Sequence, residues 1–203
     1  MKIVKINDKI SYIPSSLEPL SADIGIIKDN DLWLYDVGCG LDKIEELKGK
    51  YNVVISHFHN DHLDNINNID INNLYVSKET YKHLKPEVIN KTNVIIVSNL
   101  ISIGSIKIFP LPSSHSKGSL ALEVDNEYTF IGDSAYGNYK NNRCIYNIQN
   151  LKEEIDLLKS LNSKYLLTSH FDGFIRNKND VILELLKLYD KKSKNSSYII
   201  ADI

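Results

Sequence analysis

The feature that most constrains this 203-residue chain is a histidine-rich segment that directly follows an apolar run. Residues 51–56 are rich in valine and isoleucine, which favours a buried strand, and the next six residues read His-Phe-His-Asn-Asp-His. His57 and His59 are two residues apart, so an extended backbone directs both imidazoles to the same side. Three imidazoles and a carboxylate within six residues are costly to pack without an ion. The segment therefore predicts a metal site at the end of a buried strand.

Asp61 and His62 complete the segment and predict a second ion. They are adjacent, and we expect them at the start of the following helix, projecting toward a neighbouring position. The positive end of that helix favours an ionised carboxylate at Asp61. One ion would therefore lie at His57 and His59, and the other beside it. Imidazole and carboxylate ligands suit zinc, iron or manganese, so the ligand types leave the metal open.

The order of expected elements is strands, helices, strands, helices, with a theme repeated in the two halves of the chain. We expect helices at residues 41–48, 78–84, 151–161 and 180–189. We expect strands at residues 2–6, 10–13, 22–28, 32–36, 51–56, 74–76, 94–97, 105–111, 119–124, 128–131, 165–168 and 198–203. This order favours two packed sheets with helices on their outer faces. The length predicts a single domain over residues 1–203.

Composition argues against several classes of protein. The formal net charge is -2, and only Arg143 and Arg176 are arginines, so we expect no nucleic-acid partner. Cys39 and Cys144 are too few for a disulfide framework. Charges interrupt the N-terminal residues too early for a signal peptide, and no run approaches the roughly 18–20 apolar residues of a membrane span. We therefore expect a cytoplasmic protein with no membrane partner, acting on a small molecule.

The histidine-rich segment resembles the signature of the metallo-β-lactamase superfamily, whose later ligands also have counterparts here in the expected order. His115 lies in a small serine- and glycine-containing loop at residues 113–119, as the family pattern requires. Asp133 follows the apolar run 129–132, and His170 follows the strand expected at 165–168. The resemblance covers nearly the whole chain and accounts for five of the six histidines. The sixth, His83, lies on a polar helix and is expected to be a surface residue.

This resemblance implies an α+β fold, a four-layer αββα sandwich, with two divalent metal ions. Zinc is the expected metal, with manganese or iron as alternatives. Asp133 would bridge the ions together with a water or hydroxide. Asp36, which matches the family's early Asp-x-Gly element, would support the ligands from behind and fix imidazole orientation. The implied ligands are His57, His59 and His115 for one ion and Asp61, His62 and His170 for the other.

The function implied is that of a binuclear metal-dependent hydrolase. A metal-bridging hydroxide would attack a small ester, thioester, lactone or phosphodiester, and Asp61 would accept or relay a proton. No protein nucleophile is needed, and the sequence contains no Gly-x-Ser-x-Gly element. The histidine and aspartate ligand set resembles that of glyoxalase II-like thioesterases and lactonases. The best-known class of true lactamases carries cysteine where Asp133 stands, which argues against antibiotic hydrolysis.

Two other functions remain open from the sequence. One is a mononuclear iron oxidoreductase similar to the persulfide dioxygenases, which keep a histidine at the position of His59. The flavin-coupled di-iron relatives usually carry glutamate at that position, so His59 argues against that group. The other is a non-catalytic metal-binding domain. Degenerate domains of that kind usually lose ligands, whereas this chain keeps all seven.

Three side chains that follow ligands in the sequence are candidates for substrate contact. Tyr136 could donate to an oxyanion, and Arg176 and Lys117 could bind a substrate carboxylate. The alternatives are a tyrosine packed on the rim of the site and two solvated charges.

Overall fold

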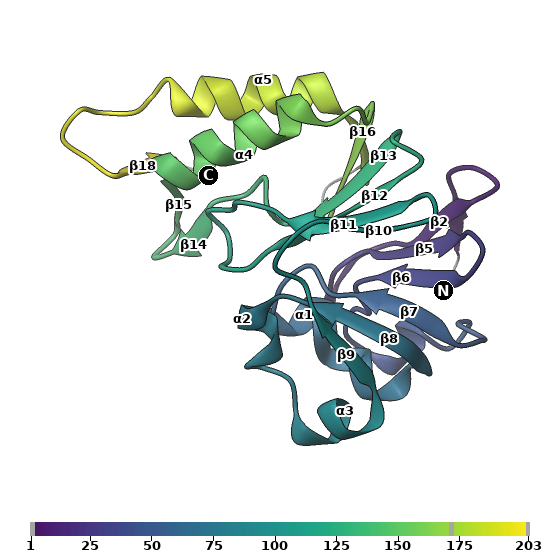
Figure 1. Cartoon of the computed structure of the whole chain (residues 1–203). Helices are drawn as coiled ribbons and strands as arrows, with labels where there is room; N and C mark the ends of the chain where they lie inside the picture. The colour runs from purple at the N-terminus through teal and green to yellow at the C-terminus, as the bar shows by residue number, and fades with distance from the viewer. Residues whose placement is uncertain (1–2, 171–172, 202–203) are drawn as a thin grey trace.

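The computed structural model of the chain describes residues 3–170 and 173–201. Two large sheets lie face to face, and helices cover the outer face of each, as Figure 1 shows. The helices α4 (Ile148–Ser160) and α5 (Lys178–Tyr189) lie over one sheet, and shorter helices lie over the other. The predicted αββα sandwich is therefore confirmed.

The first sheet has seven strands in the order β1-β2-β5-β6-β7-β8-β9. Its strands are antiparallel from β1 to β6 and parallel from β6 to β9. β7 is buried along its whole length, and its residues other than Asn52 are apolar or aromatic, as is typical of a strand covered on both faces. The strand bounds are β1 (Val4–Lys5), β2 (Ile10–Ile13), β5 (Ile24–Lys28), β6 (Leu32–Tyr35), β7 (Tyr51–Val54), β8 (Ile71–Val76) and β9 (Asn93–Ile96). The covering helices are η1 (Leu41–Lys43), α1 (Asn60–Leu63), η2 (Asp64–Asn68), α2 (Lys78–Tyr81) and α3 (Pro86–Lys91).

The second sheet has six strands in the order β10-β11-β12-β13-β16-β17, and its β13 and β16 are parallel. The strand bounds are β10 (Ile101–Ile103), β11 (Ile106–Pro110), β12 (Leu120–Val124), β13 (Tyr128–Gly132), β16 (Tyr165–Thr168) and β17 (Ile175–Asn177). Two smaller sheets complete the fold. One joins β14 (Asn138–Lys140), β15 (Arg143–Asn147) and β18 (Tyr198–Ala201), and the other is the hairpin of β3 (Ser16–Leu17) and β4 (Leu20–Ser21).

The core consists of three layers of apolar side chains that follow from this architecture. The central layer lies between the two sheets and includes Trp33, Tyr35 and Phe130, all almost completely buried. The other two layers lie between each sheet and its helices. Burying each large apolar side chain contributes about 1.5–3 kcal/mol, so the central layer holds the two sheets together strongly.

The parallel strand pairs bring chemically important residues to one edge of the sandwich. Asp36 follows β6 and His57 follows β7, and these two strands are parallel neighbours. Asp133 follows β13 and His170 follows β16, which form the parallel pair of the second sheet. The carboxyl ends of both pairs therefore meet where the sheets adjoin.

Two expected helices differ from the structure. The helix predicted at 41–48 is wrong: only the single turn η1 forms, because the Lys43 side chain is buried and donates to the carbonyl of Pro14 instead of facing solvent. The helix predicted at 78–84 ends at Tyr81, and α3 begins separately at Pro86, where proline suits a first helical position.

The remaining expected elements agree with the structure within a few residues at each end. The strands expected at 2–6 and 198–203 include residues 2, 202 and 203, which lie outside the described residues. Within the described ranges, no helix is both long enough and apolar enough to cross a membrane.

Candidate metal centre

Three histidine rings from both sheets converge to form the first group of potential ligands. The Nε2 atom of His57 lies 2.9 Å from Nδ1 of His59, and the Nε2 atom of His115 lies 3.1 Å from that same nitrogen. Nitrogen ligands at 2.0–2.1 Å from a tetrahedral ion lie about 3.3 Å apart, which is close to this spacing. These three rings are therefore arranged to hold one ion.

The second group combines two histidines with two carboxylates, Asp61, His62, Asp133 and His170. The Nε2 atom of His170 lies 2.9 Å from Oδ2 of Asp61, and the Nε2 atom of His62 lies 3.5 Å from the same oxygen. Oδ2 of Asp133 lies 3.3 Å from Nε2 of His62 and 3.4 Å from Nε2 of His115. Asp133 therefore reaches both groups, as expected of a bridging ligand.

Two buried polar atoms at this place support the fit to metal ions. Among the residues that the structure describes, Nε2 of His62 and Oδ1 of Asp133 have no hydrogen-bond partner. A buried polar atom without a partner costs about 1–3 kcal/mol, so such atoms require a ligand to offset that cost. Imidazole nitrogens and carboxylate oxygens are ligands that zinc, manganese and iron accept. The residues present thus fit divalent metal ions.

Three rings of the site, those of His57, His62 and His115, have a polar contact on Nδ1. Oδ2 of Asp36 lies 2.8 Å from Nδ1 of His62, and Oδ1 of Asp36 accepts the Ser56 amide at 2.7 Å. Oγ of Ser56 lies 2.9 Å from Nδ1 of His57. Nδ1 of His115 lies 3.3 Å from the carbonyl oxygen of Gly137. These contacts favour a proton on Nδ1 of His62 and of His115, which directs Nε2 of each ring toward the site.

The charges of the two groups differ. Burial lowers the pKa of His57 well below its usual value, aided by the neighbouring rings of His62 and His59. Burial likewise lowers the pKa values of His59 and His115. These three rings are therefore neutral near pH 7, which is the protonation state that binds a metal ion.

In the second group, the carboxylates affect the pKa of His62 more than burial does. Burial opposes the charge of His62, but Asp36 and Asp133 raise the pKa of His62 well above its usual value. Burial also opposes ionisation of Asp61, yet its hydrogen bond with His170 and the charge of His62 lower the Asp61 pKa to about 2. Asp61 is therefore ionised throughout the neutral range, as a carboxylate that binds a metal ion must be.

A cavity of about 510 Å³ opens above the two groups. The β3–β4 hairpin forms one wall with Leu17 and Leu20, whose exposed fractions are 87% and 52%. Ser15 and Ser16 lie at the base of that hairpin and also line the cavity. The described residues that line it include no lysine or arginine. The cavity is therefore lined by an apolar wall and by potential metal ligands.

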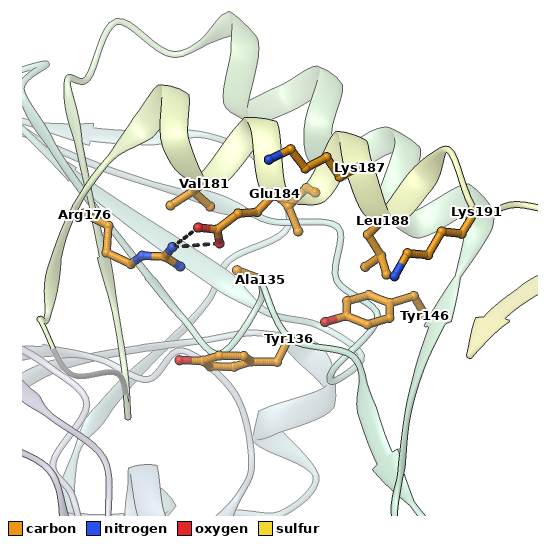
Figure 2. Close-up of a pocket in the computed structure, with 10 residues that line it drawn as sticks. Ala135, Tyr136, Tyr146, Arg176, Val181, Glu184, Lys187, Leu188 and Lys191 are labelled. Atoms are coloured by element: carbon orange, nitrogen blue, oxygen red, sulfur yellow. Dashed lines mark hydrogen bonds and ion pairs between the residues drawn. The ribbon is translucent and has the colours of Figure 1, made fainter. Parts of the chain in front are cut away.

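The three candidate substrate contacts do not line this cavity. The Tyr136 hydroxyl donates to the carbonyl of Ser169, and its ring centroid lies 6.3 Å from that of His115. Arg176 donates to both carboxylate oxygens of Glu184 at 2.6 and 2.7 Å. Figure 2 shows Tyr136 and Arg176 on a neighbouring cavity of about 310 Å³ beneath α5. Lys117 is exposed. Their contact with a substrate stays a proposal.

Sequence reasoning missed several residues that shape the site. Ser56 contacts two of the rings, with its Oγ 3.2 Å from Nδ1 of His62 as well as close to His57. Asp23 is almost completely buried and accepts the amide of His170 at 3.0 Å. The available signal for Asp23 was its position as a lone acid at the start of an apolar run. His83 is exposed, as expected, and stacks on Phe58 with ring centroids 4.2 Å apart.

Comparison with protein-family models and with curated proteins finds no match for this chain. Solved structures, in contrast, share its architecture over nearly its whole length. The DIM-1 metallo-β-lactamase superposes with a TM-score of 0.72 at 15% identity, covering 95% of this chain and 98% of that protein.

Two further similar structures have names that refer to di-iron proteins. The flavodiiron protein from Giardia intestinalis has a TM-score of 0.65 at 14% identity, covering 94% of this chain; the chain spans only 59% of that protein. The chemotaxis sensor ODP, solved as a peroxy diiron species, has a TM-score of 0.67 at 14% identity, covering 91% of this chain and 94% of that one. The layers, the strand order and these likenesses together identify the chain as having the metallo-β-lactamase fold.

Proposed function

We propose that this protein is a binuclear metal-dependent hydrolase that acts on a small substrate with an electrophilic carbonyl. The observation that carries the proposal is the convergence of seven ligand side chains in two adjacent groups below an accessible cavity. Two divalent ions bound there, foremost zinc, supply Lewis acidity and a hydroxide near neutral pH. Because that hydroxide serves as the nucleophile, no serine or cysteine nucleophile is needed.

The chain's own residues contribute binding, orientation and proton transfer. His57, His59 and His115 bind as neutral rings, while Asp61 and Asp133 supply negative charge that balances the ions. The Asp61 carboxylate, next to Nε2 of His170, accepts or relays the proton of the attacking water. The buried Asp36 keeps His62 in one tautomer throughout. These preorganised groups remove the need for rearrangement during the reaction.

The lining of the cavity favours an uncharged ester, thioester or lactone. A phosphodiester carries a negative charge, and sites for such groups are commonly built with arginine or lysine. None of the described lining residues is of that type, while Leu17 and Leu20 offer an apolar wall. An acyl chain or apolar alcohol placed against these leucines would lie in the same cavity that Asp133 and His115 line. We therefore place a neutral, partly apolar carbonyl compound ahead of a phosphodiester.

An iron-dependent oxidoreductase is the second candidate. The likeness to a flavodiiron protein and to the sensor solved as a peroxy diiron species favours it, because the same ligand types accept iron. His59, however, stands where the flavin-coupled relatives usually carry glutamate, so a mononuclear iron enzyme of the persulfide dioxygenase kind is the closer alternative. A non-catalytic metal-binding domain is the third.

The decisive experiment begins with a count of metal ions per chain in purified protein. We expect close to two ions of zinc or manganese, and hydrolysis of nitrophenyl esters, thioesters and lactones that exceeds hydrolysis of bis-nitrophenyl phosphate. Faster phosphodiester hydrolysis would overturn the substrate class and leave the binuclear site in place. A single iron together with oxygen consumption on a persulfide substrate would replace the hydrolase with the oxidoreductase.

A further inference from the structure

Asp23 joins two parts of the site that are far apart in the sequence. It lies between β4 and β5, and its side chain is only 3% exposed. Oδ1 of Asp23 accepts the backbone amide of Ser15 at 3.0 Å, and Oδ2 accepts the backbone amide of His170 at 3.0 Å. One carboxylate therefore fixes both the base of the β3–β4 hairpin and the backbone of a potential metal ligand.

The backbone of His170 needs such support because its φ angle is +66°. A non-glycine residue in this left-handed region is disfavoured by roughly 1 kcal/mol or more, and surrounding contacts must stabilise it. The preceding residue is held on both sides: the Ser169 amide donates to the carbonyl of Gly132 at 3.2 Å, and the Ser169 carbonyl accepts from Tyr136. At His170 itself the amide hydrogen bond is the one to Asp23.

The hairpin base is held by a second buried side chain. Lys43, 1% exposed, donates its ammonium to the carbonyl of Pro14, the residue before Ser15. Burial lowers the pKa of Lys43, while the charges of Asp23 and Asp42 oppose this shift. Asp23 and Lys43 thus hold the two consecutive residues from which the hairpin extends, but only Asp23 also reaches His170.

We infer that Asp23 is a positioning residue that sets His170 for metal binding and ties it to the hairpin that walls the substrate cavity. This inference rests on the proposed metal-binding function. Asp23 does not touch the ligand ring, so it acts through the backbone of His170. Loss of one of its two acceptor oxygens therefore weakens ligation by the group that contains His170, and leaves the group of His57, His59 and His115 unchanged.

Three variants separate this role from a general structural one. Asp23→Asn keeps the shape of the side chain but presents an amide group to one of the two backbone donors. Lys43→Met releases the Pro14 carbonyl alone and does not affect His170 directly. Asp31→Asn removes a carboxylate from an exposed turn and serves as the matched surface control.

The test is titration of the metal-free full-length proteins with Co²⁺, followed by the visible absorption of each bound ion. We expect two ions in the wild-type protein, and for Asp23→Asn a 10–100-fold weaker affinity for one of them, as is usual when a partner that orients a ligand is lost. Lys43→Met and Asp31→Asn should keep both affinities within about twofold of the wild-type values, which is less than the effect expected for an orienting partner.

The outcomes are distinguishable. If wild type binds fewer than two ions, the proposed function fails. If wild type binds two and Asp23→Asn binds both equally tightly, the inference is overturned and the proposed function stands. Amide hydrogen exchange of metal-free wild type supplies a test that needs no variant. We expect slow exchange at His170 and Ser15, and exchange at the rate of an open loop at both would overturn the inference even if Asp23→Asn failed to fold.

Discussion

The Asp36 carboxylate and the His62 imidazole form a completely buried pair, with Oδ2 2.8 Å from Nδ1. The charge of Asp36 and that of Asp133 raise the pKa of His62, although burial opposes this. In the metal-bound state the Asp36 contact keeps the proton on Nδ1 and the lone pair of Nε2 directed at the ion. The contact with Asp36 occupies Nδ1 of His62, so Nε2 is the nitrogen left for metal binding.

Replacing Asp36 with asparagine should weaken the binding of one ion by about 10–100-fold, because the partner that fixes the His62 tautomer loses its charge. The measurement is zinc competition against a chromophoric chelator, with Asp31→Asn as a surface control. Unchanged affinity for both ions in Asp36→Asn would show that Asp36 does not orient this ligand.

The ligand assignment itself is tested by His59→Ala and Asp133→Ala. We expect each to lower kcat/KM by about 10³-fold or more while the chain stays folded, because both residues belong to one unit that supplies the reactive group. The assay is ester hydrolysis combined with far-UV circular dichroism. Wild-type activity in either variant would contradict the proposed site.

Removal of the ions should also lower stability. A ligand present at 100 times its dissociation constant stabilises the folded state by about 2.7 kcal/mol, which for a chain of this size corresponds to a Tm change of about 5–10 °C. Thermal unfolding with and without a chelator measures this change, and added Zn²⁺ should restore the original Tm. A Tm that does not respond to chelation would argue against tight binding.

Glu154 of α4 predicts a pH effect away from the metal ions. Its side chain is completely buried, neither carboxylate oxygen has a hydrogen-bond partner in the described part of the chain, and burial raises its pKa well above the usual value. The unfolded chain ionises this group above about pH 4.5, whereas burial in the folded chain favours the protonated form, so the contribution of Glu154 to stability falls as pH rises from there.

The variant Glu154→Gln lacks this titration. Its stability relative to wild type should therefore increase as pH rises from 5 to 8, by up to about 1.4 kcal/mol for each unit by which folding raises the pKa of Glu154. Urea unfolding of both metal-free proteins at several pH values measures the difference. Parallel stability curves for the two proteins would show that Glu154 ionises normally in the folded state.

The proposed apolar wall is tested by the double variant Leu17→Ser and Leu20→Ser. Both side chains are largely exposed, so the fold should be unaffected. We expect KM for an apolar ester to rise about tenfold, since two leucine contacts are worth more than 1.4 kcal/mol, while kcat for a short acetyl ester stays similar. If the double variant changed the kinetic constants of the apolar ester and of the acetyl ester by the same factor, the acyl chain would not bind against these leucines.

Much of the architecture could be predicted from sequence because the relevant signals are local. The apolar run before His57 and the runs before Asp133 and His170 form short strands, and each strand ends one to three residues before a potential ligand. Alternating strand and helix patterns then gave the two covered sheets. Such local patterns predict which residues follow the end of a strand. The potential ligands follow strand ends, and this position places them together at one edge of the sandwich.

The parts that could not be predicted depend on contacts between distant segments. Asp23 and His170 are 147 residues apart in the sequence, and no local pattern marks their contact. The failed helix at 41–48 reflects the burial of Lys43 against Pro14, which overrides a helical spacing. The β14–β15 hairpin, in contrast, has a local sequence signal, the pair Asn141 and Asn142, because asparagine tolerates the positive φ angles that both residues adopt in this two-residue turn.

Both potential metal-binding groups draw side chains from the two halves of the chain. His57 and His59 come from the first sheet and His115 from the second, and Asp61 and His62 meet Asp133 and His170 in the same way. Neither half alone presents all the side chains of either group, so a complete site forms only when the two halves are packed together. Ions bound there would act as reversible cross-links between the halves, and would slow any unfolding route that begins by separating the two sheets.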